Sequence, residues 1–288
     1  MNGIVAAIYS SFFLALSQGA LKKGYKEFEP SVAFLFDSLF GFFLWVPLAI
    51  YFGINTSFLG EVFIYALLSA ILSEALYFYA LSKGQLSITA ILLGSYPIYT
   101  ILLSYFINNE RLTTIQAIFI ALTIVGTLIT YLPSKLSVEE LKKSGAIFWP
   151  LIAAVGVGLS DSFSKRIINK TGDFSFLFML ALVQLPVAYL YLKIERQKVF
   201  GSITNTIKNI KSYKFPLAGS FFNIIGTGLL WISFSFTLAS IASPITATSG
   251  AIVVLLAVIF MDENISIKSI LGLFMVFIGI IGISSVTH

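Results

Sequence analysis

The sequence contains no cysteine, and its one histidine is the final residue, His288. Disulfide bonds, thiol chemistry and histidine-based metal sites are therefore excluded, and we expect no cofactor. No Gly-Lys-Ser/Thr motif of an ATP-binding loop is present either. Charged residues make up only 11% of the 288 residues, whereas 58% are hydrophobic, and the mean hydropathy is +0.95. Such a composition is typical of a membrane protein and not of a soluble domain.

Long apolar runs account for most of the chain, and ten of them are long enough to cross a bilayer, which takes about 20 residues per helix. The ten runs are 4–21, 32–52, 61–81, 86–107, 114–132, 146–164, 174–192, 215–238, 244–261 and 267–286. Most connections are short, so consecutive helices should be antiparallel neighbours. The sequence predicts an all-α, multi-pass protein of the cell membrane with ten transmembrane helices.

The chain repeats itself once. Residues 16–23 (Leu-Ser-Gln-Gly-Ala-Leu-Lys-Lys) align with residues 159–166 (Leu-Ser-Asp-Ser-Phe-Ser-Lys-Arg), and each copy contains five of the apolar runs. An odd number of spans forces the second copy to cross the membrane in the opposite direction. We therefore expect residues 1–133 and 145–288 to form two inverted five-helix repeats around a central cavity, joined by the polar linker 134–144.

The fourth run is bordered by a distinctive pattern. It is entered through residues 80–90 (Ala-Leu-Ser-Lys-Gly-Gln-Leu-Ser-Ile-Thr-Ala), it contains Pro97, and Glu-Arg-Leu-Thr begins thirteen residues later at Glu110. This pattern resembles the EamA repeat of the drug/metabolite transporter (DMT) superfamily, and the second half carries a looser copy. The resemblance covers nearly the whole chain. It implies a ten-helix transporter whose third span lines the central cavity, and it does not indicate a substrate.

Basic residues are distributed unequally between the two sets of loops. Loops after odd-numbered runs hold fourteen Lys and Arg residues, and loops after even-numbered runs hold four. By the positive-inside rule this difference places both termini outside the cell. The family resemblance instead implies cytoplasmic termini, so the orientation stays open at this point.

A carboxylate in the third span is the first candidate for a functional residue. An ionisable side chain inside a span is costly unless it is paired or hydrated. Glu74 lies far from either end of its run, with Tyr77 and Phe78 on the same helical face. A carboxylate beside aromatic rings suits an amine or a quaternary ammonium group. Because burial favours the protonated form of a carboxyl group, Glu74 is also a candidate for proton coupling; a structural hydrogen bond is the alternative.

Two further carboxylates lie within spans. Asp161 is near the end of the sixth run, aligned with Gln18 in the first copy, so we assign both residues to the substrate site and Asp161 also to possible proton coupling. A local ion pair with Lys165, four residues on, is the alternative for Asp161. Asp37 lies in the second run, which the resemblance places at the periphery, and we expect a structural role for it.

The other candidates lie on the fourth, eighth and ninth runs. Pro97 should kink the fourth run, because proline removes a backbone hydrogen bond. Polar and aromatic residues recur at four-residue spacing on the eighth run, and small hydroxyls open the ninth, where Pro244 after Ser243 predicts a helix start. We assign these residues to the cavity, with helix packing as the alternative: Ser95, Tyr96, Pro97, Tyr99, Asn223, Thr227, Trp231, Thr246 and Ser249.

These features favour a secondary transporter that exports a small organic metabolite, such as an amino acid or an amine, by alternating access. A small multidrug or quaternary-ammonium transporter is the alternative. The interiors of the last three spans hold no basic residue, which argues against phosphorylated anions. The expected partners are the substrate and the lipid bilayer. Nucleic acid is not expected, because the positive charge lies in membrane loops; the protein is expected to be a monomer, with a homodimer as the alternative.

A membrane-embedded enzyme and a scaffold without a substrate are alternatives of another class. An enzyme requires clustered catalytic residues at one membrane face, and the sequence offers no such cluster. A scaffold has no need of a carboxylate in mid-span. We therefore expect no catalytic residue and no enzymatic activity.

Overall fold

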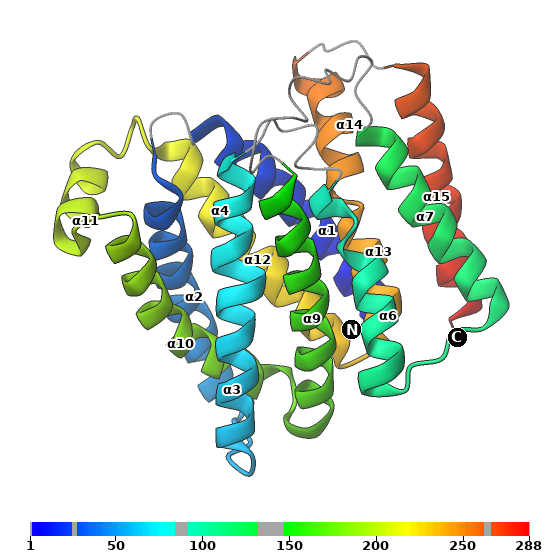
Figure 1. Ribbon diagram of the computed structural model, residues 1–288, viewed down its shortest axis with the longest axis horizontal. Coiled ribbons are helices and arrows are strands. Elements are labelled where there is room, and N and C mark those ends of the chain that lie inside the picture. The colour runs from blue at the N-terminus through cyan, green and yellow to red at the C-terminus, as the bar shows by residue number, and fades with distance from the viewer. Residues whose placement is uncertain (1, 25–27, 84–91, 132–146, 262–265, 288) are drawn as a thin grey trace.

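The structure, a computed structural model, describes residues 2–24, 28–83, 92–131, 147–261 and 266–287, and all regular elements within these ranges are helices (Figure 1). The helices of the first half are α1 (Gly3–Gly24), α2 (Pro30–Phe52), α3 (Leu59–Ser69), η1 (Ala70–Ala75), α4 (Leu76–Lys83), α6 (Tyr96–Asn108) and α7 (Thr114–Tyr131). Those of the second half are α9 (Phe148–Thr171), α10 (Asp173–Ile194), α11 (Val199–Lys208), α12 (Lys214–Phe234), α13 (Ala239–Ala247), α14 (Ser249–Met261) and α15 (Ile267–Val286). The predicted all-α class is confirmed within these ranges, and the linker 134–144 lies outside them.

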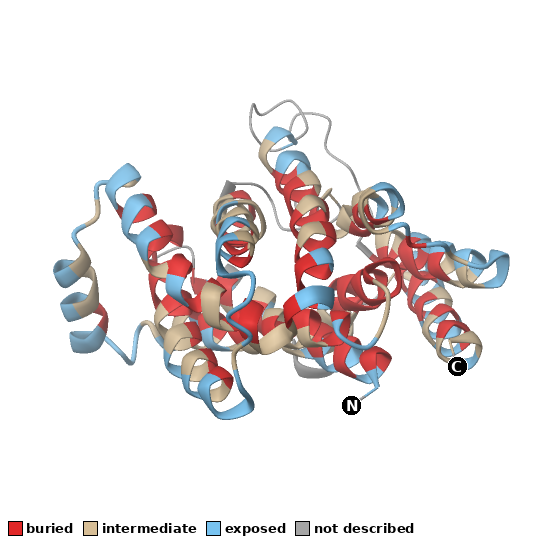
Figure 2. Ribbon diagram, turned by 90° about the horizontal axis from the view of Figure 1, so that it is seen from below, coloured by how far each residue is buried: buried red, intermediate tan, exposed pale blue. Residues whose placement is uncertain are grey.

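The described part of the chain has the surface of a membrane protein. Seven of its helical stretches are long and apolar enough to cross a bilayer. Buried residues gather on the inward faces of the helices and exposed residues on the outward faces (Figure 2). Large apolar side chains are among the exposed ones, including Phe43 (72%), Phe106 (70%) and Phe274 (65%). Apolar surface on this scale requires lipid rather than water around it. The count of ten spans stays a prediction.

The third span is one long helix with a change of winding in its middle. Residues Ala70–Ala75 form a π-helix, η1, between the α-helical segments α3 and α4. A π-helix bonds each N–H to the carbonyl five residues back, so it changes the face on which the following residues lie, and such segments are common at functional sites. Glu74 lies in η1. Nothing in the hydrophobic pattern predicted this element.

Two prolines differ from their predicted positions in the helices. The fourth span is interrupted at Ser95, and Pro97 lies in the first turn of α6 rather than at a kink within one continuous helix. Proline has no N–H to offer, and the first turn of a helix does not need one. The predicted helix start at Pro244 is wrong: α13 begins at Ala239 and contains Pro244. A carboxylate from the other half caps this earlier start, as described below.

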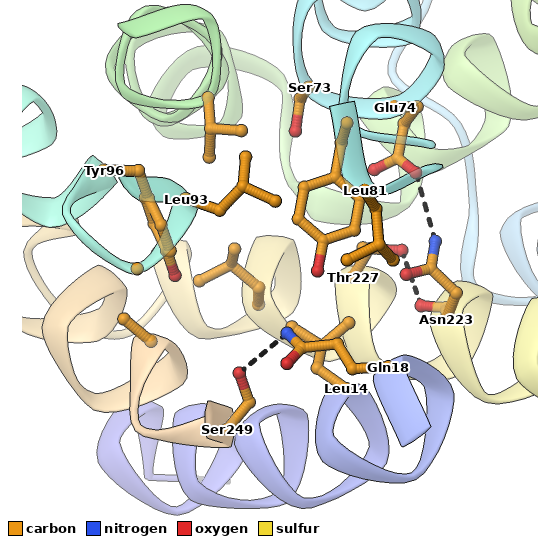
Figure 3. Close-up of a pocket in the computed structure, with 15 residues that line it drawn as sticks. Leu14, Gln18, Ser73, Glu74, Leu81, Leu93, Tyr96, Asn223, Thr227 and Ser249 are labelled. Atoms are coloured by element: carbon orange, nitrogen blue, oxygen red, sulfur yellow. Dashed lines mark hydrogen bonds between the residues drawn. The ribbon is translucent and has the colours of Figure 1, made fainter. Parts of the chain in front are cut away.

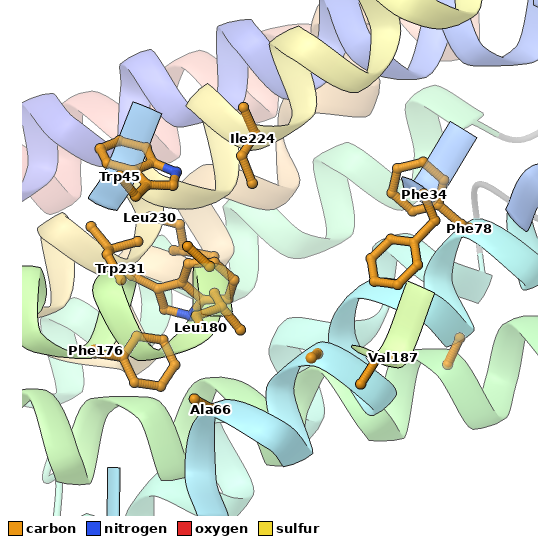
Figure 4. Packing of buried hydrophobic residues seen from close by; sticks show 14 of the residues in the cluster. Phe34, Trp45, Ala66, Phe78, Phe176, Leu180, Val187, Ile224, Leu230 and Trp231 are labelled. Atoms are coloured by element: carbon orange, nitrogen blue, oxygen red, sulfur yellow. The ribbon is translucent and has the colours of Figure 1, made fainter. Parts of the chain in front are cut away.

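The principal helix pairs join the two halves of the chain. Helix α1 packs along α12, α2 along α10, α6 along α9 and α7 along α15. The last pair approaches closely because both helices carry glycine: a Cβ on Gly126 would lie 2.7 Å from the carbonyl oxygen of Gly272. Between the pairs lies an aromatic and aliphatic core. Figure 4 shows Phe34 beside Phe78 and Phe176 beside Trp231, with ring centroids 5.5 and 5.4 Å apart.

Candidate functional site

A cavity lies where helices of the two halves meet. Its empty space amounts to about 720 Å³, a figure that includes the solvent at its open mouth. Residues from α1, η1, α4, α6, α9, α12, α13 and α14 form its wall (Figure 3). They are Leu14, Gln18, Ser73, Glu74, Tyr77, Leu81, Leu93, Gly94, Tyr96, Val157, Asn223, Thr227, Leu230, Ala247 and Ser249.

Seven of the candidate residues predicted from the sequence lie on this wall: Gln18, Glu74, Tyr77, Tyr96, Asn223, Thr227 and Ser249. They come from helices that are far apart in the sequence and are linked by hydrogen bonds across the cavity. The Gln18 Nε2 amide donates to the Ser249 hydroxyl at 3.2 Å. The Tyr96 hydroxyl donates to the backbone carbonyl of Ser243 at 3.0 Å. The polar groups are thereby held in place before any ligand enters.

Glu74 is the carboxylate of the cavity wall. Its side chain is 1% exposed, and Oε2 accepts a hydrogen bond from Asn223 Nδ2 at 3.2 Å (Figure 3). The other oxygen, Oε1, is buried without a hydrogen-bond partner. A buried carboxylate oxygen without a donor is costly, so it is a natural place for a ligand to supply a hydrogen or a positive charge.

The aromatic neighbours of Glu74 are divided between the cavity and the core. Tyr77 lies on the wall with Glu74. Phe78, predicted to share that face, is fully buried against Phe34 and does not line the cavity. Helix α2 covers that side of α4, where Phe34 contacts Phe78 with ring centroids 5.5 Å apart. Trp231 likewise packs in the core against Phe176.

Four other predicted residues serve helix packing or turns in the structure and do not line the cavity. The Ser95 hydroxyl donates to the carbonyl of Leu92, within the interruption before α6. Thr246 is fully buried, and its hydroxyl donates to the carbonyl of Ala7 on α1 at 3.5 Å. Pro97 lies in the first turn of α6. Tyr99 follows it and lies beside Gly158 on α9.

Asp161 lies one layer behind the cavity wall. Its Oδ2 accepts hydrogen bonds from the hydroxyls of Thr100 on α6 (3.0 Å) and Ser243 on α13 (2.6 Å). The ion pair with Lys165, considered as an alternative, is not formed. Lys165 instead donates to the backbone carbonyls of Phe234 and Thr237, at the end of α12. Asp161 therefore links three helices through neutral donors.

Glu110, the glutamate of the family motif, lies at the opposite end of the turn that joins α12 to α13. Glu110 follows α6, and its two oxygens accept hydrogen bonds from the backbone N–H groups of Ala239 (3.0 Å) and Ser240 (2.9 Å). A carboxylate at a helix N-terminus satisfies free N–H groups and complements the helix dipole. Glu110 thus caps α13, while Lys165 binds the carbonyls that end α12. The turn between α12 and α13 is held from both sides by charged residues.

One residue assigned a structural role from the sequence lies beside the candidate site. Asp37 is fully buried, and its Oδ1 accepts a hydrogen bond from the same Asn223 Nδ2 that binds Glu74, at 3.0 Å. The sequence signal was present, since Asp37 is a carboxylate within a span. Asp37 was not assigned to the site because the family resemblance places the second span at the periphery.

Metal binding has no support among the described residues, where no cluster of three His, Asp or Glu side chains could hold an ion. The same part of the chain contains one ion pair, between Lys170 and Glu61 at the surface. The carboxylates near the cavity therefore have no cationic partner within the described structure. Their close donors there are amides and hydroxyls.

A helical membrane protein with a cavity between two halves has the architecture of a transporter. Comparison with known proteins gives the family: the sequence pattern of the EamA-like transporter family matches residues 1–132 and again residues 144–285. The chain belongs to this family. It is a multi-pass integral membrane protein and a transporter rather than an enzyme.

Several similar proteins support this assignment. An "Uncharacterized transporter" of Clostridium kluyveri is 23% identical over 223 residues, which is 77% of this chain and 70% of that protein. The S-adenosylmethionine uptake transporters of Rickettsia conorii and Rickettsia bellii are 25% and 26% identical. Those matches span 56% and 54% of this chain, and 54% and 53% of the relatives, or about half of each protein. A solved structure titled "Crystal structure of protein" shares the fold, with a TM-score of 0.70 and 13% identity over 99% of this chain and 98% of that one.

Proposed function

We propose that the protein is a secondary transporter of a small organic metabolite with a positively charged amino-type group. Transport would proceed by alternating access between two inverted five-helix halves, which together make ten spans. The cavity around Glu74 would be the substrate site. In this proposal residues 1–133 and 145–288 are the two halves.

Helix directions support the inverted arrangement. The first helix of the second half, α9, is antiparallel to the third span, because the hydroxyl of Ser160 bonds that of Ser69 while Gly156 lies beside Leu72. In the first half, α1 is antiparallel to α12: Gly3 lies beside Thr237 and Gly24 beside Pro216. Each half thus meets helices of opposite direction in the other half. The repeated match to one family pattern agrees with two equivalent units.

The observation that carries the proposal is the unpartnered oxygen of Glu74 on the cavity wall. The lining contains this carboxylate and no lysine or arginine among the described residues. A positively charged ligand would pair with Glu74, whereas a phosphorylated anion would be repelled. The amides of Gln18 and Asn223 and the hydroxyl of Thr227 could bind the polar remainder of a metabolite.

The names of two relatives suggest a first compound to test. S-adenosylmethionine carries a sulfonium and an ammonium group, which a carboxylate beside aromatic rings suits. The relatives are named for uptake, while we predicted export from the sequence. Transport should therefore be measured in both directions, with S-adenosylmethionine, cationic amino acids and polyamines as candidate substrates.

A transporter of quaternary ammonium compounds is the second candidate. The rings of Tyr77 and Tyr96 lie on the cavity wall with Glu74, and aromatic faces attract quaternary ammonium groups. Tetraalkylammonium ions should be included in the same panel. Competition between them and the amines would decide which class binds more tightly.

The decisive experiment uses the purified full chain in proteoliposomes. We expect Glu74→Gln to transport radiolabelled substrate at least about tenfold more slowly than the wild type. A tenfold loss of substrate affinity corresponds to about 1.4 kcal/mol of binding free energy. Thermal stabilisation by the same compound in detergent should disappear in parallel.

The matched control is Glu61→Gln, which makes the same chemical change at the surface, where Glu61 pairs with Lys170. This variant should transport as the wild type does. Undiminished transport by Glu74→Gln, or equal loss in both variants, would refute the role of Glu74.

A further inference from the structure

Two carboxylates from different helices share one amide at the cavity wall. Asp37 on α2 and Glu74 on η1 are 0% and 1% exposed. Asn223 Nδ2 on α12 donates to Asp37 Oδ1 at 3.0 Å and to Glu74 Oε2 at 3.2 Å. A side-chain amide nitrogen has two hydrogens, so these two bonds use its full donor capacity. The three residues form one unit, which we call the Asp37–Asn223–Glu74 cluster.

Each carboxylate of the cluster keeps one oxygen without a partner. Asp37 Oδ2 and Glu74 Oε1 are both buried and accept no hydrogen bond. The one ion pair in the described part of the chain, Lys170–Glu61, is at the surface, so no basic side chain described there neutralises the cluster. Two buried negative charges held by one neutral amide repel each other and are poorly solvated. Within the described part of the chain, protonation is therefore what neutralises the pair.

The two acids differ in their access to the cavity. Glu74 lines it, and Asp37 does not. An ionised Glu74 can be stabilised by water or a ligand entering the cavity, whereas an ionised Asp37 would have only Asn223. The proton on Asp37 is thus the harder one to remove. The proton on Glu74 is the one that a ligand can displace.

We propose that the Asp37–Asn223–Glu74 cluster is a proton-exchange site, in which Asp37 stays protonated and Glu74 exchanges one proton for the positive charge of the substrate. The Glu74 O–H bond breaks, its proton passes to water in the cavity, and the carboxylate pairs with the incoming cation. Charge at the site is conserved in this step. Asp37 acts as a positioning residue: its neutral carboxyl group lets Glu74 carry the only negative charge of the pair.

The helices packed around Glu74 add few other titratable groups. One carboxylate, Asp161 on α9, acts on Glu74 through space, and the phenol of Tyr77 on α4 lies beside it. The other polar side chains that line the cavity are neutral: Gln18, Ser73, Tyr96, Asn223, Thr227 and Ser249. Asp161 Oδ2 is bound by Thr100 and Ser243, and Asp161 Oδ1 has no partner. Because Asp161 does not line the cavity and Glu74 does, the exchange is assigned to Glu74.

A ligand-free measurement tests the site itself. The full chain in lipid nanodiscs is titrated across neutral pH while infrared difference spectra follow the stretch of protonated carboxyl groups. We expect one titrating carboxyl signal in the wild type, its loss in Glu74→Gln and its retention in Asp37→Asn. Retention is expected because the uncharged amide of Asp37→Asn imitates the neutral acid that the proposal assigns to Asp37. A signal lost in Asp37→Asn and kept in Glu74→Gln would overturn the assignment, as would the absence of any titrating signal in the wild type.

A second measurement tests the exchange and rests on the function proposed above. Calorimetric titration with S-adenosylmethionine, in two buffers of different ionisation enthalpy, gives the number of protons released per ligand. We expect one proton from the wild type and from Asp37→Asn when the pH keeps Glu74 protonated, and no binding to Glu74→Gln. Binding to the wild type without proton release would overturn the exchange. If the infrared result holds and this probe does not bind, the proton site stands and the substrate class is wrong.

Discussion

Glu74 and Glu110 are both buried glutamates, with 1% and 6% of their surface exposed, but their surroundings differ. Glu110 accepts three hydrogen bonds, two from backbone N–H groups and one from the Ser240 hydroxyl at 2.6 Å, so both oxygens are used. Glu74 accepts one bond from an amide and leaves the second oxygen unpartnered. One carboxylate is saturated by the protein, and the other is left available on the wall of a cavity.

The difference separates a structural charge from a functional one. A saturated carboxylate at a helix N-terminus stabilises that helix and has nothing to offer a ligand. An unsaturated carboxylate lowers stability and gains a partner only when a ligand or a proton arrives. Replacement by glutamine should therefore lower stability at Glu110 and not at Glu74.

The largest effect on stability is expected for Glu110→Gln. An amide presents one acceptor oxygen, so one N–H group at the start of α13 loses its partner, at a cost of about 1–3 kcal/mol. The free energy of unfolding should fall accordingly, measured by denaturation of the full chain in detergent micelles. Glu74→Gln, which replaces an acid whose second oxygen has no partner, should unfold no more easily than the wild type.

Ser240→Ala is the matched control for Glu110, because it removes the hydroxyl donor and leaves both backbone bonds in place. It should be milder than Glu110→Gln. If Glu110→Gln is as stable as the wild type, or if Glu74→Gln is the less stable of the two glutamine variants, the contrast between the two glutamates is wrong.

A smaller loss is expected for Lys165→Met, at the other side of the same turn. The carbonyls of Phe234 and Thr237 lose their donor, but the cost of burying an ammonium group disappears as well, which leaves a net loss of about 1 kcal/mol. The same unfolding assay measures it. Arg166→Gln, the exposed neighbour, should show no loss, and equal losses in the two variants would contradict the role given to Lys165.

The smallest effect is expected for Glu61→Gln. Glu61 pairs with Lys170 at 2.8 Å, but both side chains are about one-third exposed, at 31% and 39%. Exposed ion pairs contribute little, and we expect a loss of about 0.3 kcal/mol that shrinks further at high salt. Unfolding at two ionic strengths checks this. A loss as large as that of Glu110→Gln would show that exposure does not weaken the Glu61–Lys170 ion pair.

Sequence reasoning identified the cavity carboxylate, because a charge within an apolar span is conspicuous. It also identified Gln18, Asn223 and Thr227, which lie on the same wall. It misplaced Phe78 because spacing along a helix does not show that α2 covers this side of α4 through Phe34. It assigned Trp231 to the cavity because a helix pattern gives spacing on a face but not which neighbour covers that face.

The partners of the buried charges could not be read from spacing either. Lys165 is four residues from Asp161, yet it binds carbonyls of α12, and Glu110 caps a helix that begins more than a hundred residues later. Asp37 and Glu74 are joined by an amide from the other half of the chain. Each of these contacts depends on how the helices pack.

The sequence alone determined that the chain is helical and lies in a membrane, because apolar runs of this length need lipid around them and helical hydrogen bonds within them. It also determined that a few carboxylates are buried, because they lie in the interior of apolar spans. Only the tertiary structure decided which of these carboxylates are saturated and which is left open to a ligand. Hydrogen bonds are directional and short, so the saturation of each oxygen depends on donors that distant helices bring within about 3 Å.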